Sequence, residues 1–440
     1  MSESTNVNGG AMLDMAKGAV RRNILRGVNK LTRREQTENY RYNLKDEQGA
    51  ETECIIPGDQ VIIALMVAPR RCGKTTLMIS IVKEFERVMG EGCAIVPVNE
   101  GKMEKLDERW CALREFSSSP TFHSGVDASD SLEIHEFLIY NKQRPRNAFL
   151  FRFIDVPGEW VHSYPDAMRV LISGADILYI TMDAPALIED GGQYCSEINA
   201  PENVLKLTEV LCEGEVEKRK RLMLFVPVKC EKYYWRMISG VQTDAMDELT
   251  RSVEKLYEPL LEGIRNNEQV ANDLTIAVTP ILTVGGVKFS QFRRITDERG
   301  VSILSEEYVR VRGYISDRDG YSPRLCDQPM FYTMRFVSKL ICENAGRGRM
   351  MDFAADMKGL GMKKAMQFAF NDPLAGYLIE KTKIADFREF TTIEMYQKTE
   401  NISGDRAALS LPVGVYVNND VLGMRVISDP CDFFGADKSV

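Results

Sequence analysis

Histidine and closely spaced cysteines are scarce in this sequence. It contains three histidines and ten cysteines, and no two cysteines form a C-x-x-C pair. A structural zinc site needs clustered ligands, and a disulfide scaffold needs a high density of cysteine in a short chain, so the sequence favours neither. The N-terminus is polar and lacks the apolar core of a secretory signal. We therefore expect a reduced, cytoplasmic protein.

Long hydrophobic runs are also missing. The longest uninterrupted apolar stretch covers eight residues, 61–68. A membrane-spanning helix needs about 20 such residues, so the sequence predicts no span. With 44% hydrophobic and 27% charged residues, the composition is that of an ordinary globular protein.

The net charge of −8 is unevenly distributed. Residues 17–34 contain seven Lys or Arg and no acid, so the remaining chain carries about −15. A uniformly acidic body gives no reason to expect nucleic acid as the main ligand.

The basic segment has the pattern of an amphipathic helix over residues 14–34. Its apolar residues recur at helical spacing: Ala16, Val20, Ile24, Val28 and Leu31. Two interpretations stay open. The helix packs on the protein's own surface with its basic face outward, or it makes peripheral contact with an anionic membrane or an acidic partner.

Strand-like and helix-like segments alternate across residues 55–343. Apolar runs predict strands at residues 61–67, 132–140, 148–154, 177–182, 222–228 and 275–284. Helical periodicity predicts helices at residues 75–89, 201–212, 243–264 and 330–342, with Asn199 as N-cap of the second. This order predicts an α/β domain with a mostly parallel sheet and helices on both faces. Ligands of such sheets bind at the carboxyl ends of the strands.

Three segments lie outside this alternation. Residues 1–50 are expected to hold a disordered start and the basic helix, and residues 288–326 a polar insertion. Residues 346–440 form a C-terminal α+β extension, with a helical pattern at 350–370 and a possible strand within 409–427.

Residues 68–75 read A-P-R-R-C-G-K-T, between an apolar strand and a helix. This is the pattern of a phosphate-binding P-loop (Walker A), with Ala68 in place of the usual first glycine. Backbone N–H groups of such a loop surround the phosphates, and the helix N-terminus adds partial positive charge. The expected nucleotide-binding residues are Arg71, Cys72, Gly73, Lys74, Thr75 and Thr76. Lys74 supplies a point charge, and the hydroxyl of Thr75 is offered to Mg²⁺.

A second motif, D-V-P-G-E-W, occupies residues 155–160 at the end of a predicted strand. Asp155 is expected to hold Mg²⁺, and Gly158 to present its N–H to the γ-phosphate. Glu159 is a candidate catalytic residue that orients or deprotonates the attacking water. The alternative is that Glu159 pairs with a neighbouring arginine.

Two further candidates depend on position alone. Thr121 lies in a segment where a switch threonine would close on Mg²⁺, with Ser124 as a competitor. Arg70 and Arg71 lie inside the phosphate loop, where a guanidinium could reach the γ-phosphate as an arginine finger does. The alternatives are an ordinary loop threonine and arginines that face solvent or an acidic partner.

The predicted strand at 222–228 ends in V-K-C-E-K, residues 228–232. A base-reading N-K-x-D motif would place its lysine at Lys229 and its carboxylate at Glu231, with Val228 replacing the asparagine. The alternative is a solvated Lys/Glu turn. The backbone of residues 283–286 could contact the base from the other side. The motif favours guanine over adenine without deciding between them.

These motifs together resemble those of bacterial YcjX-like and double-GTPase P-loop proteins, which are similar to Ras-type (TRAFAC) GTPases. The shared D-x-P-G-E-W string is the most specific element, and the resemblance covers roughly residues 55–343. It implies binding of GTP and Mg²⁺ at Lys74, Thr75 and Asp155, followed by slow hydrolysis. It does not cover the basic helix or the C-terminal extension.

Three hypotheses follow. The first is a GTPase that acts as a regulatory switch for a protein partner or a membrane. The second is an ATP-using P-loop enzyme, because the base motif is imperfect. The third is a scaffold that binds nucleotide without turnover. Competition between nucleotides separates the first two, and phosphate release separates the third.

Overall fold

The computed structural model describes residues 21–32, 39–344 and 422–430, apart from short gaps at 47, 59–60, 90–92, 119–130, 143, 214–218, 297–299, 301, 312–320 and 327. The predicted helix at 350–370 and the start of the chain lie outside these residues.

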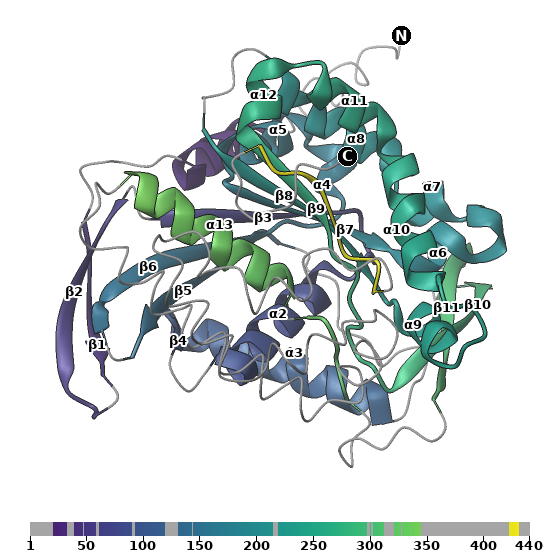
Figure 1. The fold of residues 1–440 in the computed structure, drawn as a ribbon, viewed down its shortest axis with the longest axis horizontal. Helices are drawn as coiled ribbons and strands as arrows, with labels where there is room; N and C mark the ends of the chain where they lie inside the picture. The colour runs from purple at the N-terminus through teal and green to yellow at the C-terminus, as the bar shows by residue number, and fades with distance from the viewer. Residues whose placement is uncertain are drawn as a thin grey trace, which may run out of the picture.

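An eight-stranded sheet forms the centre of the protein, in the order β12-β9-β8-β7-β3-β6-β5-β4 (Figure 1). Neighbours from β9 to β6 pair in parallel, whereas β12, β5 and β4 each pair antiparallel with their neighbours. The strands are β3 (Val61–Val67), β4 (Cys93–Pro97), β5 (Glu133–Asn141), β6 (Arg144–Asp155), β7 (Ile177–Asp183), β8 (Arg221–Val228), β9 (Leu274–Val278) and β12 (Arg425–Ser428). The expected mostly parallel α/β sheet is therefore confirmed.

Burial explains why the central strands read as continuous apolar runs. Every residue of β3, β7 and β8 is buried, because helices cover both faces of the sheet. On β3, Ile62 and Ala64 face one hydrophobic cluster while Ile63 and Leu65 face the other. This alternation divides the core into two layers, one on each side of the sheet.

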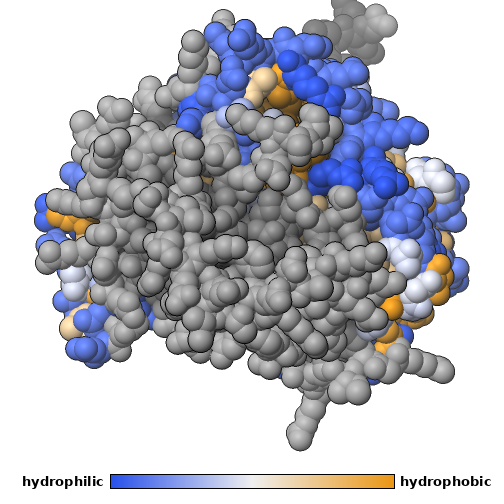
Figure 2. All heavy atoms as spheres, viewed as in Figure 1, coloured by the Kyte–Doolittle hydropathy of each residue, from blue (hydrophilic) through white to orange (hydrophobic). Residues whose placement is uncertain are grey.

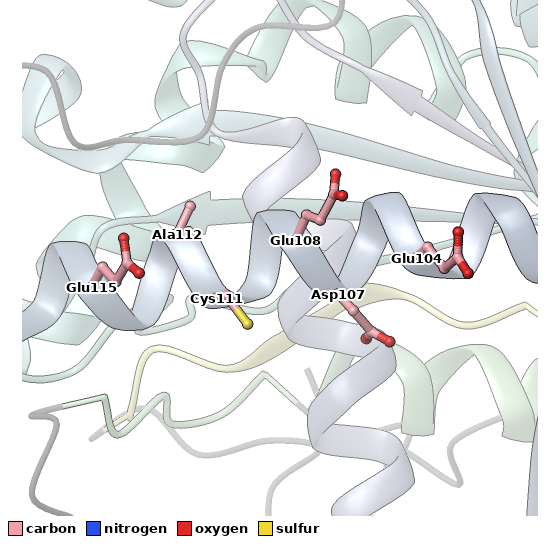
Figure 3. Close-up of a pocket in the computed structure, with 6 residues that line it drawn as sticks. All are labelled: Glu104, Asp107, Glu108, Cys111, Ala112 and Glu115. Atoms are coloured by element: carbon pink, nitrogen blue, oxygen red, sulfur yellow. The ribbon is translucent and has the colours of Figure 1, made fainter.

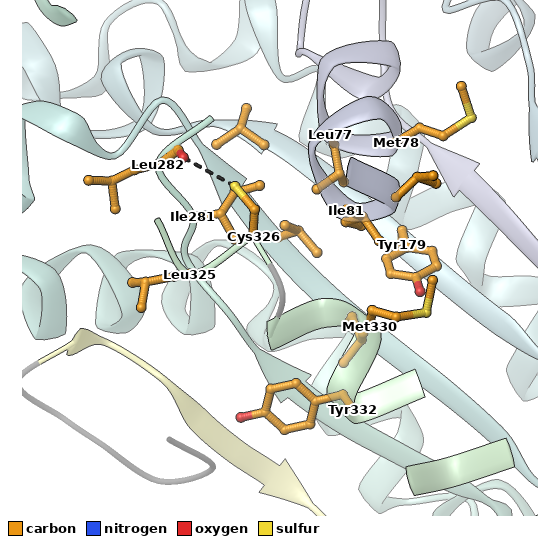
Figure 4. Packing of buried hydrophobic residues seen from close by; sticks show 14 of the residues in the cluster. Leu77, Met78, Ile81, Tyr179, Ile281, Leu282, Leu325, Cys326, Met330 and Tyr332 are labelled. Atoms are coloured by element: carbon orange, nitrogen blue, oxygen red, sulfur yellow. Dashed lines mark hydrogen bonds between the residues drawn. The ribbon is translucent and has the colours of Figure 1, made fainter. Parts of the chain in front are cut away.

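Two groups of helices form the outer layers. One face carries α2 (Lys74–Met89), α3 (Glu100–Ser118), α9 (Glu231–Ile238) and α13 (Gln328–Asn344). Figure 4 shows Leu77 and Ile81 of α2 packing near Tyr179 of β7 and Met330 of α13. The opposite face carries α5 (Pro165–Gly174), α8 (Pro201–Thr208) and α11 (Glu258–Arg265).

The remaining helices of the domain are shorter than α2, α3 and α13. They are α4 (Trp160–Ser163), α6 (Ala184–Ile188), η2 (Glu189–Gly192), α7 (Cys195–Ile198), η3 (Glu209–Cys212), α10 (Ala245–Leu256) and α12 (Glu268–Asp273). Hydrophilic residues predominate at the top of the molecule in Figure 2, where α11 and α12 lie in Figure 1. No helix among the described residues is long and apolar enough to cross a membrane.

Two local predictions were wrong. The single helix expected at 243–264 is divided into α10 and α11 at Tyr257, and Pro259 lies in the first turn of α11. Proline has no N–H to donate to the preceding turn, so it favours a new helix start. Asn199 is not the N-cap of α8. Ala200 holds that position in a left-handed conformation, and the Asn199 side chain bonds the backbone of Asp183 instead.

The basic segment is helical over residues 21–32. Val28 is buried in the cluster that also contains α5, and the carbonyl of Leu31 accepts a hydrogen bond from Arg152 at 3.2 Å. Arg22, Arg26 and Lys30 are exposed. The described part of the helix therefore packs on the protein's own surface, with basic residues outward.

Five further strands lie in segments for which the sequence predicts no definite structure. β1 (Asn39–Lys45) and β2 (Glu51–Pro57) form a separate antiparallel pair. β10 (Val287–Thr296) and β11 (Ser302–Arg310) form a hairpin within the polar insertion. β12 lies at the end of the 409–427 segment and extends the central sheet beside β9. The C-terminal extension thus contributes a strand to the domain.

Candidate nucleotide-binding site

The predicted site residues meet at one edge of the sheet. β3 lies between β6 and β7, and all three strands end at this edge because they run in parallel. Residues 68–73 follow β3, Asp155 ends β6, and Asp183 ends β7. Lys229 follows β8, which is parallel to β7. The chain leaves β3 toward α2 on one face of the sheet and leaves β6 toward α5 on the other face. This edge is therefore a switch point of the kind where ligands of such sheets bind.

The loop at 68–73 turns sharply into α2. Arg71 and Gly73 adopt positive φ angles of 71° and 78°. A side chain at position 73 would approach Val228 Cγ2 to 3.1 Å, so glycine also allows close packing on β8. The loop therefore directs backbone amides around the N-terminus of α2, where the partial positive charge of the helix favours an anion.

Lys74 is bent back over this loop. Its Nζ donates hydrogen bonds to the carbonyls of Ala68 at 3.1 Å and Pro69 at 3.3 Å. Burial lowers the pKa of Lys74, while the carboxyl of Asp155 opposes that change. A buried ammonium that spans the loop supplies a fixed positive charge at its mouth.

Thr75 and Asp155 lie side by side beneath the loop. The Thr75 hydroxyl donates to Asp155 Oδ2 at 3.0 Å, and both residues are buried. Hydroxyl and carboxylate oxygens are the hard ligands that Mg²⁺ accepts in phosphate sites. Two residues 80 positions apart thus form a donor set that fits this ion.

The loop after β6 is packed directly against the phosphate loop. A Cβ at Gly158 would lie 2.1 Å from the backbone nitrogen of Arg70 and 2.6 Å from the carbonyl carbon of Pro69. Any side chain at this position would clash with backbone atoms. Gly158 therefore allows the two loops to meet.

Glu159 and the two arginines occupy different places. Arg70 forms an ion pair with Glu159 at 2.8 Å, and both side chains are about half exposed. The Arg71 guanidinium instead donates to the carbonyl of Leu304 on β11 at 3.1 Å. Of the two arginines, Arg70 is the one whose side chain lies beside Glu159, whereas Arg71 keeps only its backbone in the loop.

The other predicted residues differ in what they offer. The Cys72 thiol donates to the carbonyl of Ile198 at 3.1 Å, and burial raises its pKa to about 12, so only the Cys72 backbone is available to an anion. Thr76 is half-buried in the first turn of α2. Thr121 and Ser124 lie outside the described residues.

Lys229 is held in a buried cluster of charges at the other end of the site. It has a positive φ of 62°, and its Nζ lies 2.5 Å from Asp183 Oδ2 and 2.6 Å from Glu306 Oε2. Burial alone would lower the pKa of Lys229, but the two carboxylates raise it well above its ordinary value. Burial, reinforced by Glu306, raises the pKa of Asp183 to about 7.

Glu231 lies near the backbone segment with which it was expected to share the base. Its Oε1 accepts hydrogen bonds from the N–H groups of Val284 at 2.9 Å and Gly285 at 3.2 Å. The side chain is buried, and this burial raises its pKa although the two N–H groups oppose the change. The structure thus brings Glu231 and residues 284–285 together, but through bonds to each other.

Sequence reasoning missed Asp183 and Glu306. Asp183 ends β7 as Asp155 ends β6, so a carboxylate at the end of a buried strand was a usable signal. Glu306 belongs to the hairpin, and no motif in the sequence indicated that this segment reaches Lys229.

A separate hollow of about 580 Å³ runs along one face of α3 (Figure 3). Its lining consists of Glu104, Asp107, Glu108, Cys111, Ala112 and Glu115. Four carboxylates would repel phosphate, and no residue of the loops after β3 or β6 contributes to it. This hollow is therefore not part of the site.

In comparisons with known proteins, no protein-family model matches the chain and no curated protein is significantly similar to it in sequence.

Proposed function

We propose that the chain binds GTP and hydrolyses it in a Mg²⁺-dependent reaction, and that it acts as a regulatory switch. The observation that carries this proposal is the contact between Thr75 and Asp155 at 3.0 Å, directly beneath a loop spanned by Lys74. The sequence alone placed these residues in two separate motifs. Their meeting at the switch point of the sheet supports a common role.

Charge and geometry support phosphate binding at the loop of residues 68–73, Lys74, Thr75 and Asp155, which we call the phosphate end. We call the surroundings of Lys229 the base end. The loop amides and the α2 N-terminus would surround the phosphates, and Lys74 would exchange its two loop carbonyls for phosphate oxygens. Thr75 and Asp155 would hold Mg²⁺, which neutralises charge on the outer phosphates. Catalysis in such a site is positioning and electrostatic stabilisation, with no covalent intermediate.

In this proposal Glu159 acts on the attacking water. It follows Gly158, whose backbone touches the phosphate loop at Arg70. In the present state the Glu159 carboxylate is paired with Arg70. A bound γ-phosphate would compete for Arg70, because phosphate accepts hydrogen bonds from guanidinium strongly. Glu159 would then be released to orient water, and the loop at 155–160 would differ between the two nucleotide states.

An ATP-using P-loop enzyme is the second candidate. The observation that favours it is the position of Glu231, whose Oε1 is bound to the backbone of Val284 and Gly285. A site that lacks a carboxylate for guanine would not select against adenine.

Calorimetric titration with Mg²⁺ and GTP, GDP or ATP tests the proposal. We expect GTP to bind, and Lys74→Ala to weaken binding by about 100-fold or more, because a buried charge-assisted contact to phosphate is lost. Lys255→Ala removes an exposed lysine on α10 and serves as the matched control. Equal binding by Lys74→Ala and wild type would overturn the phosphate site, and displacement of GDP by ATP as readily as by GTP would favour the second candidate.

We also propose that the basic helix makes peripheral contact with an anionic surface. Arg22, Arg26 and Lys30 follow one another at four-residue spacing and are exposed, while Val28 anchors the helix to the body. Each cation near an anionic membrane contributes about 1 kcal/mol. Replacing all three by Gln should reduce co-sedimentation with phosphatidylserine vesicles and leave the melting temperature unchanged. Unaltered co-sedimentation of the triple variant would exclude this surface.

A further inference from the structure

The β10–β11 hairpin reaches from the polar insertion to both ends of the site. Leu304 accepts the hydrogen bond from Arg71 in the phosphate loop, and Glu306 pairs with Lys229. Figure 1 shows the hairpin beside α6 and α9. Lys232 of α9 lies 5.3 Å from the ring centre of Phe289, which fixes β10 against this helix. The hairpin is therefore part of the wall around Lys229.

Three carboxylates lie around the base end, and two of them are committed to the fold. Asp183 accepts from the N–H of Ala186 with Oδ1 and from Lys229 with Oδ2, so both oxygens are used. Glu231 is 3% exposed and accepts the two backbone N–H groups of Val284 and Gly285. Removing either carboxylate would leave buried backbone donors without a partner.

Glu306 differs from these two in its greater exposure and in its hydrogen-bond partners, which are side chains. Its side chain is 15% exposed, and its Oε2 accepts from both Lys229 and Tyr308. No backbone N–H of the described residues donates to Glu306, so its carboxylate can turn to a ligand without leaving a buried backbone donor unpaired. Glu306 is on β11, which lies outside the central sheet, and its carboxylate also forms a hydrogen bond with that of Asp183.

We propose that Glu306, and not Glu231, supplies the carboxylate that recognises guanine, an inference that rests on the proposed function. Guanine presents two donors on one edge, N1–H and the 2-amino group, and a carboxylate offers the acceptors that match them. Adenine has an acceptor at N1, which a carboxylate repels. The aliphatic stem of Lys229 provides an apolar surface for the ring, and the ring of Tyr308 borders the same carboxylate.

Nucleotide selectivity gives the test, with Mg²⁺ complexes of GTP, ITP and XTP as probes. ITP lacks the 2-amino group, and xanthine has a carbonyl where guanine has that donor. We expect Glu306→Gln to weaken GTP binding by about 10- to 100-fold, the loss typical of a hydrogen bond to a charged group. The same variant should bind XTP more tightly than wild type does, because an amide donates to the xanthine carbonyl.

Two further variants test whether selectivity depends on the Glu306 carboxylate in particular. Glu307→Gln, on the opposite face of β11, removes a carboxylate that pairs with Gln291 and Arg293, and should leave selectivity unchanged. Glu306→Asp keeps the charge and shortens the side chain, and should give an intermediate loss of GTP binding. Lys229 retains Asp183 in all these variants, so melting temperatures close to that of wild type are expected.

The outcomes distinguish this inference from the function on which it rests. A change in the GTP-to-XTP ratio for Glu306→Gln alone supports it. If Glu231→Gln changes the ratio and Glu306→Gln does not, the base is read by Glu231 and the inference is overturned. Lys74-dependent binding without any guanine preference overturns the inference but keeps a nucleotide site. Absence of Lys74-dependent binding removes both.

Discussion

The two ends of the site are built in different ways. In the loop after β3, Lys74 supplies a positive charge that is bound to the loop carbonyls, and Asp155 is in contact with Thr75. At the base end, two carboxylates surround one ammonium, and Glu231 is bound to the backbone. At the loop after β3, the internal bonds of the ammonium are to backbone carbonyls. Around Lys229 the internal bonds join charged side chains, so a ligand there has to replace ion pairs.

This difference predicts where affinity and where selectivity arise. Under the proposed function, the loop after β3 and Lys74 would contribute affinity for any nucleoside triphosphate, because the phosphates are common to all of them. Selectivity would depend on the groups around Lys229, which also stabilise the fold. Variants at the two ends should therefore have effects of different kinds, and the following predictions are designed to separate them.

Gly158→Ala should have the largest effect, because it acts on the packing between the two loops of the phosphate end. The new Cβ would lie 2.1 Å from the Arg70 backbone nitrogen, so the loops must move apart. Overpacking of this kind costs about 1–3 kcal/mol of stability. A displacement of about 1 Å in a catalytic site can lower the rate by about 100-fold. Melting temperature and phosphate release measure the two effects.

Gly101→Ala is the matched control for that substitution. Its Cβ would meet only Asn99 Oδ1, at 3.6 Å, which is an ordinary contact. This residue lies in α3, where alanine favours the helix, so stability should stay equal or rise slightly. A Gly158→Ala protein with normal turnover would show that the contact between the loops has no part in the reaction.

The fold around the loop after β3 was also the part that the sequence predicted best. Residues 68–75 are contiguous and lie between a strand and a helix, so their spacing alone determines their mutual geometry. Continuous apolar runs identified β3, β7 and β8 because those strands are buried on both faces. Local sequence patterns were sufficient to predict structure wherever one short segment determines its own conformation or burial.

The base end could not be predicted in the same way. Asp183, Lys229 and Glu306 come from three distant segments, and their contact depends on how the hairpin folds back on the sheet. β12 was similarly hidden, because its pairing with β9 joins residues about 150 positions apart. Asn199 shows on a single residue why local patterns can fail. Its side chain favours capping the next helix, but it bonds the backbone of the distant Asp183 instead.

Glu159→Gln should have an intermediate effect that is confined to turnover. The ion pair between Glu159 and Arg70 is about half exposed, and such pairs contribute at most about 1 kcal/mol, so stability and nucleotide affinity should change little. Loss of a general base lowers rates by about 100-fold or more, and retention of a hydrogen-bonding amide reduces the loss to about 10- to 100-fold. Single-turnover phosphate release at saturating GTP measures the change.

Arg70→Gln distinguishes the carboxylate from the ion pair. If Glu159 acts on water, Arg70→Gln and Glu159→Gln should differ in the pH dependence of turnover, because only the second removes an ionisable base. Identical profiles and identical losses for the two variants would assign the effect to the pair and remove Glu159 from the reaction.

Asp183→Asn should leave nucleotide affinity least affected, and it changes how stability depends on pH around Lys229. Asp183 has a pKa of about 7 in the folded protein, raised from 3.8 by burial and by Glu306. The folded state therefore binds a proton more tightly than the unfolded chain, and the free energy of unfolding falls as the pH rises from about 4 to about 7. Glu306 has a lowered pKa, so its own contribution changes only below its ordinary value of 4.5. Between pH 5 and 7 the wild type should lose stability by up to about 1.4 kcal/mol per pH unit relative to Asp183→Asn. Urea unfolding of both proteins at pH 5, 6 and 7 measures this difference. If the free energy of unfolding of the two proteins changes equally with pH, Asp183 is ionised throughout and the charge of Lys229 compensates its burial.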